Sequence, residues 1–151
     1  MSYTNSNSIS RYFDVPTLLS GGKLPEHSSE QAAGADLFLP DEYDTVVVAP
    51  MQLVKVKLML SVKIPNGMFG MLEPRSSQRA KKITFLGSGI IDSDYRGELA
   101  ILVMNLGDTD YIMKSGDKVA QLILVPYMRG NYVDIWNDTG RGAGGFGSTG
   151  V

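Results

Sequence analysis

Residues 54–64 read Val-Lys-Val-Lys-Leu-Met-Leu-Ser-Val-Lys-Ile, and this stretch decides the fold class. Every second residue from Val54 to Ile64 is apolar, and most of the residues between them are lysine or serine. A repeat of two residues is typical of a half-buried β-strand, because successive side chains point to opposite faces of a sheet. The stretch ends at the turn signal Pro65-Asn66-Gly67, and a second apolar run follows at Met68 to Leu72. The pattern therefore predicts a strand or a pair of strands, a turn and another strand.

Further short apolar runs lie on both sides of this stretch, at residues 11–15, 45–48, 83–86, 99–104, 111–113 and 119–127. Strands spaced about 8 to 12 residues apart with turns between them indicate an all-β sandwich, barrel or jelly roll. One segment has helical character, residues 76–82, with Ser76 as the expected cap.

The 151 residues suit a single domain, and the sequence contains no internal repeat. We expect a β-domain over residues 1–139, of which residues 1–30 include an extended lead-in. Of the 17 glycines, six fall within residues 140–151. Glycine loses much backbone entropy when it becomes ordered, so this segment is either a disordered tail or a loop that closes over a ligand.

Composition excludes several classes of protein. The chain has no cysteine, which removes disulfides, thiolate metal sites and thiol nucleophiles. A net charge of -2 disfavours nucleic acid as the main ligand, since a phosphate-binding protein usually has a basic excess. No apolar run approaches the roughly 18 residues of a membrane span, and residues 1–10 have no signal-peptide pattern. We therefore expect a soluble, cytoplasmic protein without a membrane partner.

Several hydrolytic motifs are absent, among them the phosphate-binding P-loop, the His-Glu-x-x-His zinc motif and the Gly-x-Ser-x-Gly nucleophile motif. The single histidine, His27, lies in a polar stretch that is typical of a surface loop. An enzyme built from this sequence therefore needs a carboxylate as its base. Asp92 follows two isoleucines, so it is expected at the end of a strand, partly enclosed, where it can act on water. The alternative is a polar hairpin turn.

Two other segments have residues that suit phosphate. Arg75, Ser76 and Ser77 stand at the expected helix start, where an arginine fork and backbone N–H groups can bind an anion; the alternative is an ordinary helix cap. The glycine-rich residues 141–150 carry one arginine, one aromatic residue and a Ser-Thr pair, which could stack on a base and wrap phosphates.

Five segments in this order resemble the motifs of the trimeric dUTPase family, the deoxyuridine triphosphate nucleotidohydrolases. They are Ala33-Gly34-Ala35-Asp36-Leu37, Pro74-Arg75-Ser76-Ser77, Gly89-Ile90-Ile91-Asp92-Ser93-Asp94-Tyr95-Arg96-Gly97, Gly116-Asp117-Lys118-Val119-Ala120-Gln121-Leu122-Ile123, and residues 141–150. The resemblance implies a jelly-roll-like β-barrel subunit, a homotrimer with shared active sites, and cleavage of dUTP to dUMP and pyrophosphate. That reaction keeps uracil out of DNA and supplies dUMP for thymidylate synthesis.

The resemblance also implies a role for each motif. Asp92 would activate the attacking water, and Tyr95 would pack beneath the deoxyribose and exclude a 2′-hydroxyl. Asp36 would act through waters on a Mg2+ ion that the triphosphate carries. Backbone groups at Leu86, Ile90, Ile91 and Ala100 would read the uracil edge. The phosphates would be held by Arg75, Ser76, Ser77 and Gln121, and the closing arm at 140–151 would contribute Arg141, Phe146, Gly147, Ser148 and Thr149.

Two positions depart from the family pattern. Gln78 and Arg79 stand where apolar or small residues are common, which affects the packing behind the phosphate loop. Lys118 replaces a common arginine and cannot make its bidentate contact.

Two other functions were weighed. A dCTP deaminase would need an acidic residue on the strand at residues 99–104, which reads Leu-Ala-Ile-Leu-Val-Met and has none. A regulatory protein that keeps the nucleotide site but acts on a protein partner stays open, with the N-terminal extension or residues 41–43 as its contact surface.

Overall fold

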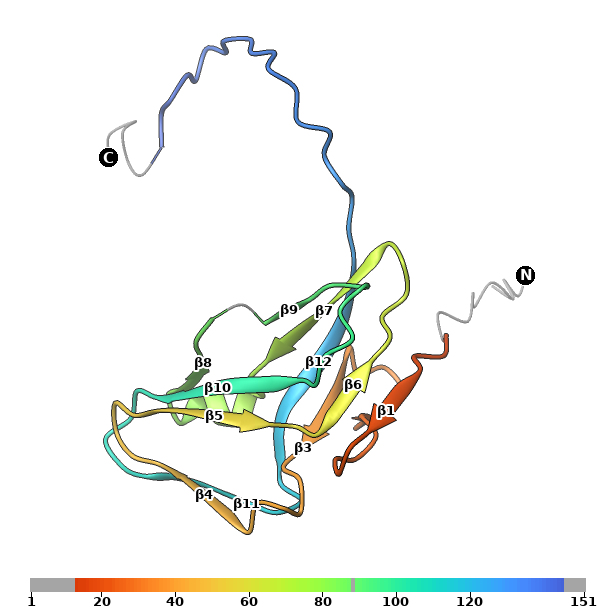
Figure 1. Cartoon of the computed structure of the whole chain (residues 1–151). Coiled ribbons are helices and arrows are strands. Elements are labelled where there is room, and N and C mark those ends of the chain that lie inside the picture. Colours follow the sequence, from red (N-terminus) through yellow and green to blue (C-terminus); the bar gives the residue numbers. More distant parts are fainter. Residues whose placement is uncertain (1–12, 88, 146–151) are drawn as a thin grey trace, which may run out of the picture.

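The computed structural model of the chain describes residues 13–87 and 89–145 (Figure 1). Within these ranges it contains twelve strands and one short helix. The strands are β1 (Thr17–Leu19), β2 (Glu26–His27), β3 (Gly34–Phe38), β4 (Thr45–Val48), β5 (Leu53–Lys57), β6 (Leu60–Val62), β7 (Met68–Glu73), β8 (Ile83–Phe85), β9 (Ile90–Ile91), β10 (Ala100–Asn105), β11 (Tyr111–Lys114) and β12 (Lys118–Pro126). The helix is α1 (Ser76–Ala80). The expected all-β, jelly-roll-like architecture is confirmed.

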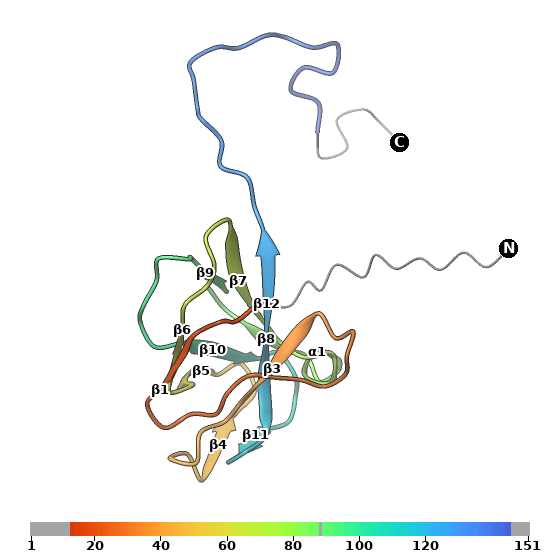
Figure 2. The same ribbon diagram turned by 90° about the vertical axis from the view of Figure 1, so that its right-hand side faces the viewer.

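The largest sheet has five strands in the order β2-β3-β12-β7-β9, with every described pairing antiparallel. A second sheet has the order β5-β10-β8, and two-stranded pairs β1-β6 and β4-β11 complete the barrel. Figure 2 shows β12, the longest strand, running through the large sheet. The buried core draws leucine, valine and isoleucine side chains from both larger sheets, including Leu37, Leu72, Val56, Ile101 and Leu122.

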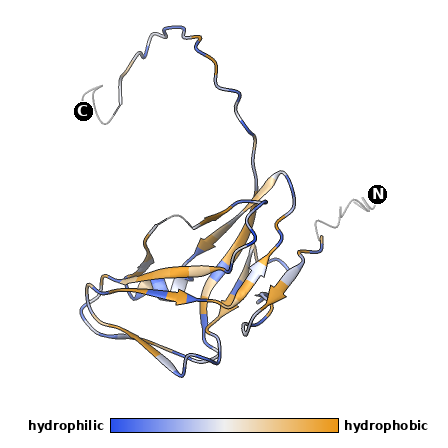
Figure 3. Cartoon of the chain, in the orientation of Figure 1, coloured by the Kyte–Doolittle hydropathy of each residue, from blue (hydrophilic) through white to orange (hydrophobic). Residues whose placement is uncertain are grey.

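Apolar residues concentrate on the strands and polar residues on the connecting segments (Figure 3). The alternating stretch is a pair of strands, β5 and β6, and its apolar members from Val56 to Ile64 are buried. The break falls at Met59, whose φ of 54° lies in the left-handed region. Here the chain changes partners, because β5 pairs with β10 whereas β6 pairs with β1. The alternation predicted the strands but not this change of sheet.

The N-terminal third differs from expectation. Residues 13–15 of the expected run at 11–15 are not in a strand, and the first strand, β1, begins at Thr17 instead. The strand β3 was not predicted, and His27 lies in the short strand β2, not in a loop, although it is exposed as expected. Glycine, alanine and aspartate are poor strand formers, so the sequence of β3 concealed it. Tertiary pairing on both of its edges, to β2 and β12, overrides that local preference.

The helix is shorter than expected and its cap is one residue earlier. Arg75, not Ser76, is the N-cap, and its backbone N–H donates to the Gln78 side chain. The helix stops at Ala80, because Lys82 has a φ of 59° that no α-helix accommodates.

After β12 ends at Pro126, residues 127–145 run away from the barrel as an extended segment (Figure 1). Its large apolar side chains are exposed, with Met128 97%, Tyr132 96% and Trp136 87% accessible. Within the described ranges, no helix has the length and apolar character needed to cross a membrane.

The core assignment predicts the outcome of a matched pair of truncations. Leu60→Ala removes a fully buried side chain and should lower the free energy of unfolding by about 2 to 5 kcal/mol. Leu53→Ala, at a position 47% exposed on the neighbouring strand β5, should cost less than about 1 kcal/mol. Urea denaturation at one fixed protein concentration measures both, and equal losses would place the core elsewhere.

Candidate active site

A polar pocket of about 390 Å³ lies where β3, β12 and the start of α1 meet. Of the expected site residues it brings together Asp36, Arg75, Ser76 and Gln121. Ser77 is exposed on the helix and does not line this pocket. The pocket also includes Ser28, Ala32, Ala33, Gly34 and Ile123, and among these the polar Ser28 was not expected from the sequence.

The pocket is assembled by strand register. Gln121 on β12 lies directly opposite Asp36 on β3 and directly opposite Glu73 on β7. Residues opposite each other in antiparallel strands point to the same face, so these three form one row across the sheet. Gln121 Nε2 donates to the Pro74 carbonyl at 3.2 Å, which fixes the start of the phosphate loop. A side chain at Gly34 would place its Cβ 2.5 Å from Gln121 Oε1, so any larger residue there would require the Gln121 amide to move.

Asp36 is buried and each of its carboxylate oxygens faces a cation. Oδ1 lies 2.9 Å from Arg75 Nε, and Oδ2 lies 2.8 Å from Lys118 Nζ. Asp36 therefore holds the Arg75 guanidinium toward the pocket, and the Arg75 side chain is 32% exposed. The expected contact of Asp36 with Mg2+ through water stays a prediction.

A β-bulge makes the Lys118 contact possible. The register between β12 and β3 shifts between Lys118 and Ala120, so that Lys118 lies opposite Phe38. A bulge reverses the faces to which the flanking side chains point. It therefore brings Lys118 to the face that carries Asp36. The sequence identified Lys118 as a departure but gave no sign of the bulge.

Gln78 is buried directly behind the pocket and is 3% exposed. Its Oε1 accepts the Arg75 N–H at 2.8 Å, and its Nε2 donates to the Val119 carbonyl at 3.0 Å. Burial raises the pKa of the neighbouring Tyr111 phenol, and a hydrogen bond with Gln78 acts in the opposite direction. The polar residue that seemed out of place in the sequence is thus hydrogen-bonded at both ends of its amide.

The segment at residues 86–91, which the resemblance assigns to reading the base, lies between the two larger sheets. It leaves β8, which pairs with β10, and enters β9, which pairs with β7. The Leu86 N–H donates to the Leu102 carbonyl at 2.9 Å, and the Gly89 carbonyl accepts the Leu72 N–H at 2.7 Å. Ile90 is 56% exposed, Ile91 is half-buried against the core, and Ala100 begins β10. Backbone groups here are thus held between two sheets, which suits recognition of a planar edge.

Asp92 directly follows β9, as expected, but its side chain is exposed and not partly enclosed. It opens a turn in which the Tyr95 N–H donates to the Asp92 carbonyl at 3.1 Å, beyond the edge strand of the sheet. Within that turn the Tyr95 hydroxyl donates to the Glu98 carbonyl at 3.2 Å. Arg96 Nη1 donates to the carbonyls of Ser93 and Tyr95 at 2.7 and 2.9 Å, which fixes the loop backbone.

The Tyr95 ring lies against Gly97. A Cβ on residue 97 would stand 2.3 Å from the Tyr95 hydroxyl oxygen and 2.5 Å from its Cζ. The glycine therefore sets the position of the ring, which is 44% exposed and forms a flat surface on the turn at residues 92–98.

Asp92 and Arg75 lie at opposite ends of one strand pair. Ile91, the residue before Asp92, faces Gly70, whereas Arg75 follows two residues after β7 ends at Glu73. Five residues of extended chain therefore separate the two positions, roughly 15 to 20 Å at about 3.3 Å per residue. The turn that carries Asp92 and Tyr95 and the phosphate pocket of the same chain are too far apart to act on one small anion.

Arg141 lies in the extended C-terminal segment, where its Nε donates to the Gly144 carbonyl at 2.9 Å. The remaining expected residues of the arm, Phe146, Gly147, Ser148 and Thr149, lie outside the described residues. The role of the arm stays a prediction.

The order of these segments is that of a known family. Residues 21–150 match the dUTPase family. The chain belongs to the dUTPase family. It is 40% identical over 139 residues to the deoxyuridine 5′-triphosphate nucleotidohydrolase of Paramecium bursaria Chlorella virus 1, covering 91% of this chain and 96% of that protein. The mouse enzyme of the same name is 39% identical over 128 residues, which cover 83% of this chain and 77% of the mouse protein.

The fold is also that of solved dUTPases. The dUTPase of Staphylococcus bacteriophage 80alpha, solved with dUpNHpp, superposes with a TM-score of 0.78 at 26% sequence identity. The match covers 91% of this chain and 99% of the phage chain.

The pocket geometry predicts which arginine binds an anion. Arg75→Ala should weaken binding of pyrophosphate by about 10-fold or more, because a charge-assisted contact in the pocket is lost. Arg79→Ala is the matched control, since Arg79 is exposed, lies on the same helix and pairs with Glu73 outside the pocket. That variant should stay within about 2-fold of the parent in calorimetric titration. Equal losses would mean that general positive charge, and not this pocket, binds the anion.

Proposed function

We propose that the protein hydrolyses dUTP to dUMP and pyrophosphate through water attack on the α-phosphorus. The observation that carries this function is the phosphate pocket with Arg75, Ser76 and Gln121 in a chain of the dUTPase family. By this reaction it keeps uracil out of DNA and provides dUMP for thymidylate synthesis. The expected cytoplasmic location stays a prediction.

Arg75, Ser76, Ser77 and Gln121 bind the phosphates in this proposal. The planar guanidinium of Arg75 offers paired donors to phosphate oxygens, and Asp36 fixes its orientation at 2.9 Å. Ser76 lines the same pocket and supplies a hydroxyl. Ser77 is exposed on α1 outside this pocket, so it would reach the phosphates from beyond the pocket lining.

The segment at residues 86–100 selects the nucleoside. Backbone groups at Leu86, Ile90, Ile91 and Ala100 read the uracil edge, and the site leaves no space for a thymine methyl group once the base is bound. The Tyr95 ring, positioned by Gly97, packs beneath the deoxyribose. A 2′-hydroxyl would meet this ring and find no partner, which penalises ribonucleotides.

Asp92 holds the attacking water and accepts its proton. An oxygen–phosphorus bond forms to the α-phosphorus, the bond from that phosphorus to the bridging oxygen breaks, and pyrophosphate leaves with the electron pair. In-line displacement at phosphorus depends mainly on positioning and charge neutralisation. The Asp92 carboxylate positions the water, and the cationic pocket neutralises the phosphate charge.

The residues of the pocket fit a magnesium ion that is carried by the substrate. Among the described residues, no group of three or more His, Asp or Glu side chains could hold a metal by itself. Magnesium prefers oxygen ligands and retains water, so triphosphate oxygens together with a nearby carboxylate suit it. When bound it neutralises phosphate charge, and Asp36 would contact it only through water.

A homotrimer with shared sites is the assembly that these residues favour. Because Asp92 and Arg75 lie roughly 15 to 20 Å apart along one strand pair, a complete site needs the Asp92 turn of one subunit beside the phosphate pocket of another. The family resemblance specifies three subunits, so sedimentation equilibrium should give three times the mass of one chain.

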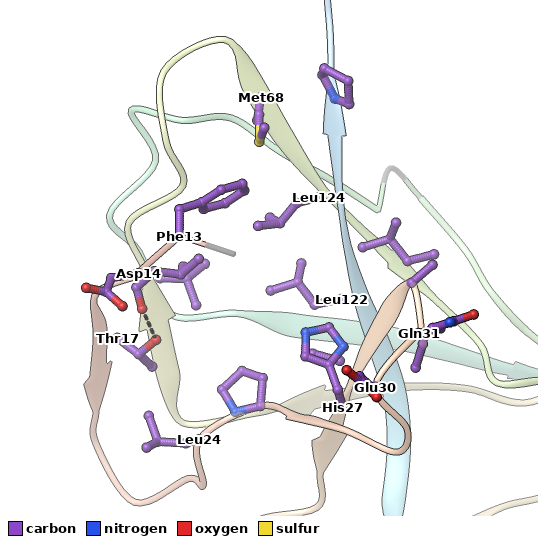
Figure 4. A pocket seen from close by; sticks show the side chains of 18 residues that line it. Phe13, Asp14, Thr17, Leu24, His27, Glu30, Gln31, Met68, Leu122 and Leu124 are labelled. Atoms are coloured by element: carbon purple, nitrogen blue, oxygen red, sulfur yellow. Dashed lines mark hydrogen bonds between the residues drawn. The ribbon is translucent and has the colours of Figure 1, made fainter. Parts of the chain in front are cut away.

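Two apolar surfaces on the chain support this assembly. A groove of about 1090 Å³ is lined by apolar side chains that include Phe13, Met68, Leu122 and Leu124 (Figure 4). The C-terminal segment exposes Tyr132 and Trp136 without covering this groove. Apolar side chains that one chain leaves exposed are typical of subunit contacts.

Two alternatives are weaker. The strand β10 carries no carboxylate from Ala100 to Asn105, so a deaminase acid is missing there. A regulatory partner stays open. The phage 80alpha dUTPase is described as controlling the transfer of virulence genes by a G protein-like mechanism, but no described residue of this chain identifies a corresponding surface.

Replacing the proposed base tests the mechanism. Asp92→Asn should lower kcat by about 100-fold to 10,000-fold while KM for dUTP changes little, because the amide keeps the shape but cannot accept a proton. Asp94→Asn changes the same charge two residues along the exposed turn and should retain turnover within a few-fold. Steady-state pyrophosphate release measures both. Turnover at the parent rate by Asp92→Asn would locate the base elsewhere.

Truncation tests the arm. A chain that ends at Thr139 should keep its melting temperature, because residues 140–145 contribute little buried surface to the barrel. Its kcat for dUTP should fall steeply, since a closing arm acts chiefly on the transition state, with stacking by Phe146 worth roughly 1 to 3 kcal/mol. Full activity would show that the segment is a plain tail, and a collapsed melting transition would show that it is structural.

A further inference from the structure

Gln78 has no part in the mechanism described so far, although it is among the few buried polar side chains of the described chain. It lies on α1, three residues after Arg75, and it does not line the phosphate pocket. A buried amide must satisfy its donors and its acceptor, because each unpaired polar group inside a protein costs stability. The partners of Gln78 therefore indicate what it does.

The acceptor of the amide is used on the phosphate loop. Gln78 Oε1 accepts the backbone N–H of Arg75 at 2.8 Å. Arg75 is the N-cap of the helix, with φ of -72° and ψ of 157°, so its backbone is extended where the next residue is already helical. The hydrogen bond fixes this change of direction, and with it the point from which the Arg75 side chain leaves the backbone.

The donor of the amide is used on the central strand. Gln78 Nε2 donates to the Val119 carbonyl at 3.0 Å. Val119 is fully buried and is the residue skipped by the bulge in the β12 to β3 register, while the pairing of β12 with β7 begins only at Gln121. Its carbonyl therefore lies outside both described ladders, and the Gln78 amide satisfies it. The same bulge brings Lys118 to Asp36, so one irregularity serves both the ion pair and the amide.

We propose that Gln78 is a positioning residue for triphosphate binding, which fastens the Arg75 backbone to the bulge of β12. Arg75 is thus fixed twice, at its backbone by Gln78 and at its guanidinium by Asp36. This inference rests on the proposed role of Arg75 in holding the phosphates of dUTP.

The test compares a ligand that has phosphates with one that lacks them. Gln78→Met keeps an unbranched side chain of similar length and removes both hydrogen bonds. It should weaken binding of dUpNHpp by about 10-fold, the loss expected when one charge-assisted contact is misplaced. Binding of deoxyuridine, which has no phosphate, should stay within about 2-fold. The ratio of the two dissociation constants is the readout, since a general loss of folded protein would not change it.

Asn105 provides a matched control. It is another buried amide, 1% exposed, and its Nδ2 donates to the carbonyls of Val48 and Thr109 at 2.8 Å each. It lies beyond the C-terminal end of α1 and does not line the phosphate pocket. Asn105→Leu should lower the melting temperature as Gln78→Met does, but it should leave the ratio of dissociation constants unchanged.

The outcomes separate this inference from the proposed function. If Arg75→Ala weakens dUpNHpp binding but Gln78→Met leaves the ratio unchanged, the positioning role is wrong and the phosphate site stands. If Arg75→Ala itself has no effect on dUpNHpp, the proposed phosphate site is wrong. Should Gln78→Met not fold, Gln78→Asn tests the same point, because a side chain shorter by one methylene cannot reach Arg75 and Val119 together. An unchanged ratio in that folded variant would also overturn the inference.

Discussion

The register of β12 against its two neighbours is the constraint on which the site depends. It places Gln121 opposite both Asp36 and Glu73, so that three segments far apart in the sequence meet in one row. The bulge at Lys118 and Ala120 then adds a cation on the face of Asp36. A shift of β12 by one residue would send Gln121 and Lys118 to the other face of the sheet. The buried Asp36 carboxylate would then lose Lys118, and removing one partner of a buried ion pair is strongly destabilising.

The same sheet keeps the parts of the chemistry separate. The pairing of β7 with β9 puts the turn that carries Asp92 and Tyr95 at one end of this strand pair and the phosphate loop at the other end. A rigid barrel cannot bring these ends together, whereas a second subunit can supply the missing half without any change of fold. This accounts for the exposure of Asp92 in the single chain, and for apolar surface that one chain leaves uncovered. In the proposed assembly, burial of the base and closure of the site both come from neighbouring chains.

Periodicity in the sequence predicted the strands whose two faces differ, and it failed where neighbours decide the structure. The stretch around Val54 to Ile64 alternates because one face is buried, so β5 and β6 could be predicted. The strand β3 could not, since its glycine, alanine and aspartate gain strand conformation only from pairing on both edges. Local pattern predicted Asp92 and the segments at 75–77 and 141–150 as candidates, and motif resemblance added the others, whereas the bulge and the role of Gln78 depend on contacts between α1 and β12 that no local pattern encodes.

The central claim is that this site acts on a deoxyuridine triphosphate and on no close relative of it. The most direct measurement is the rate of pyrophosphate release from dUTP, dTTP, dCTP and UTP, compared as kcat/KM with the full chain and magnesium present. We expect rapid release from dUTP and values lower by about 100-fold or more for the other three, because each of them places a crowded or unpaired group against residues 86–100. Comparable values for UTP and dUTP would contradict it.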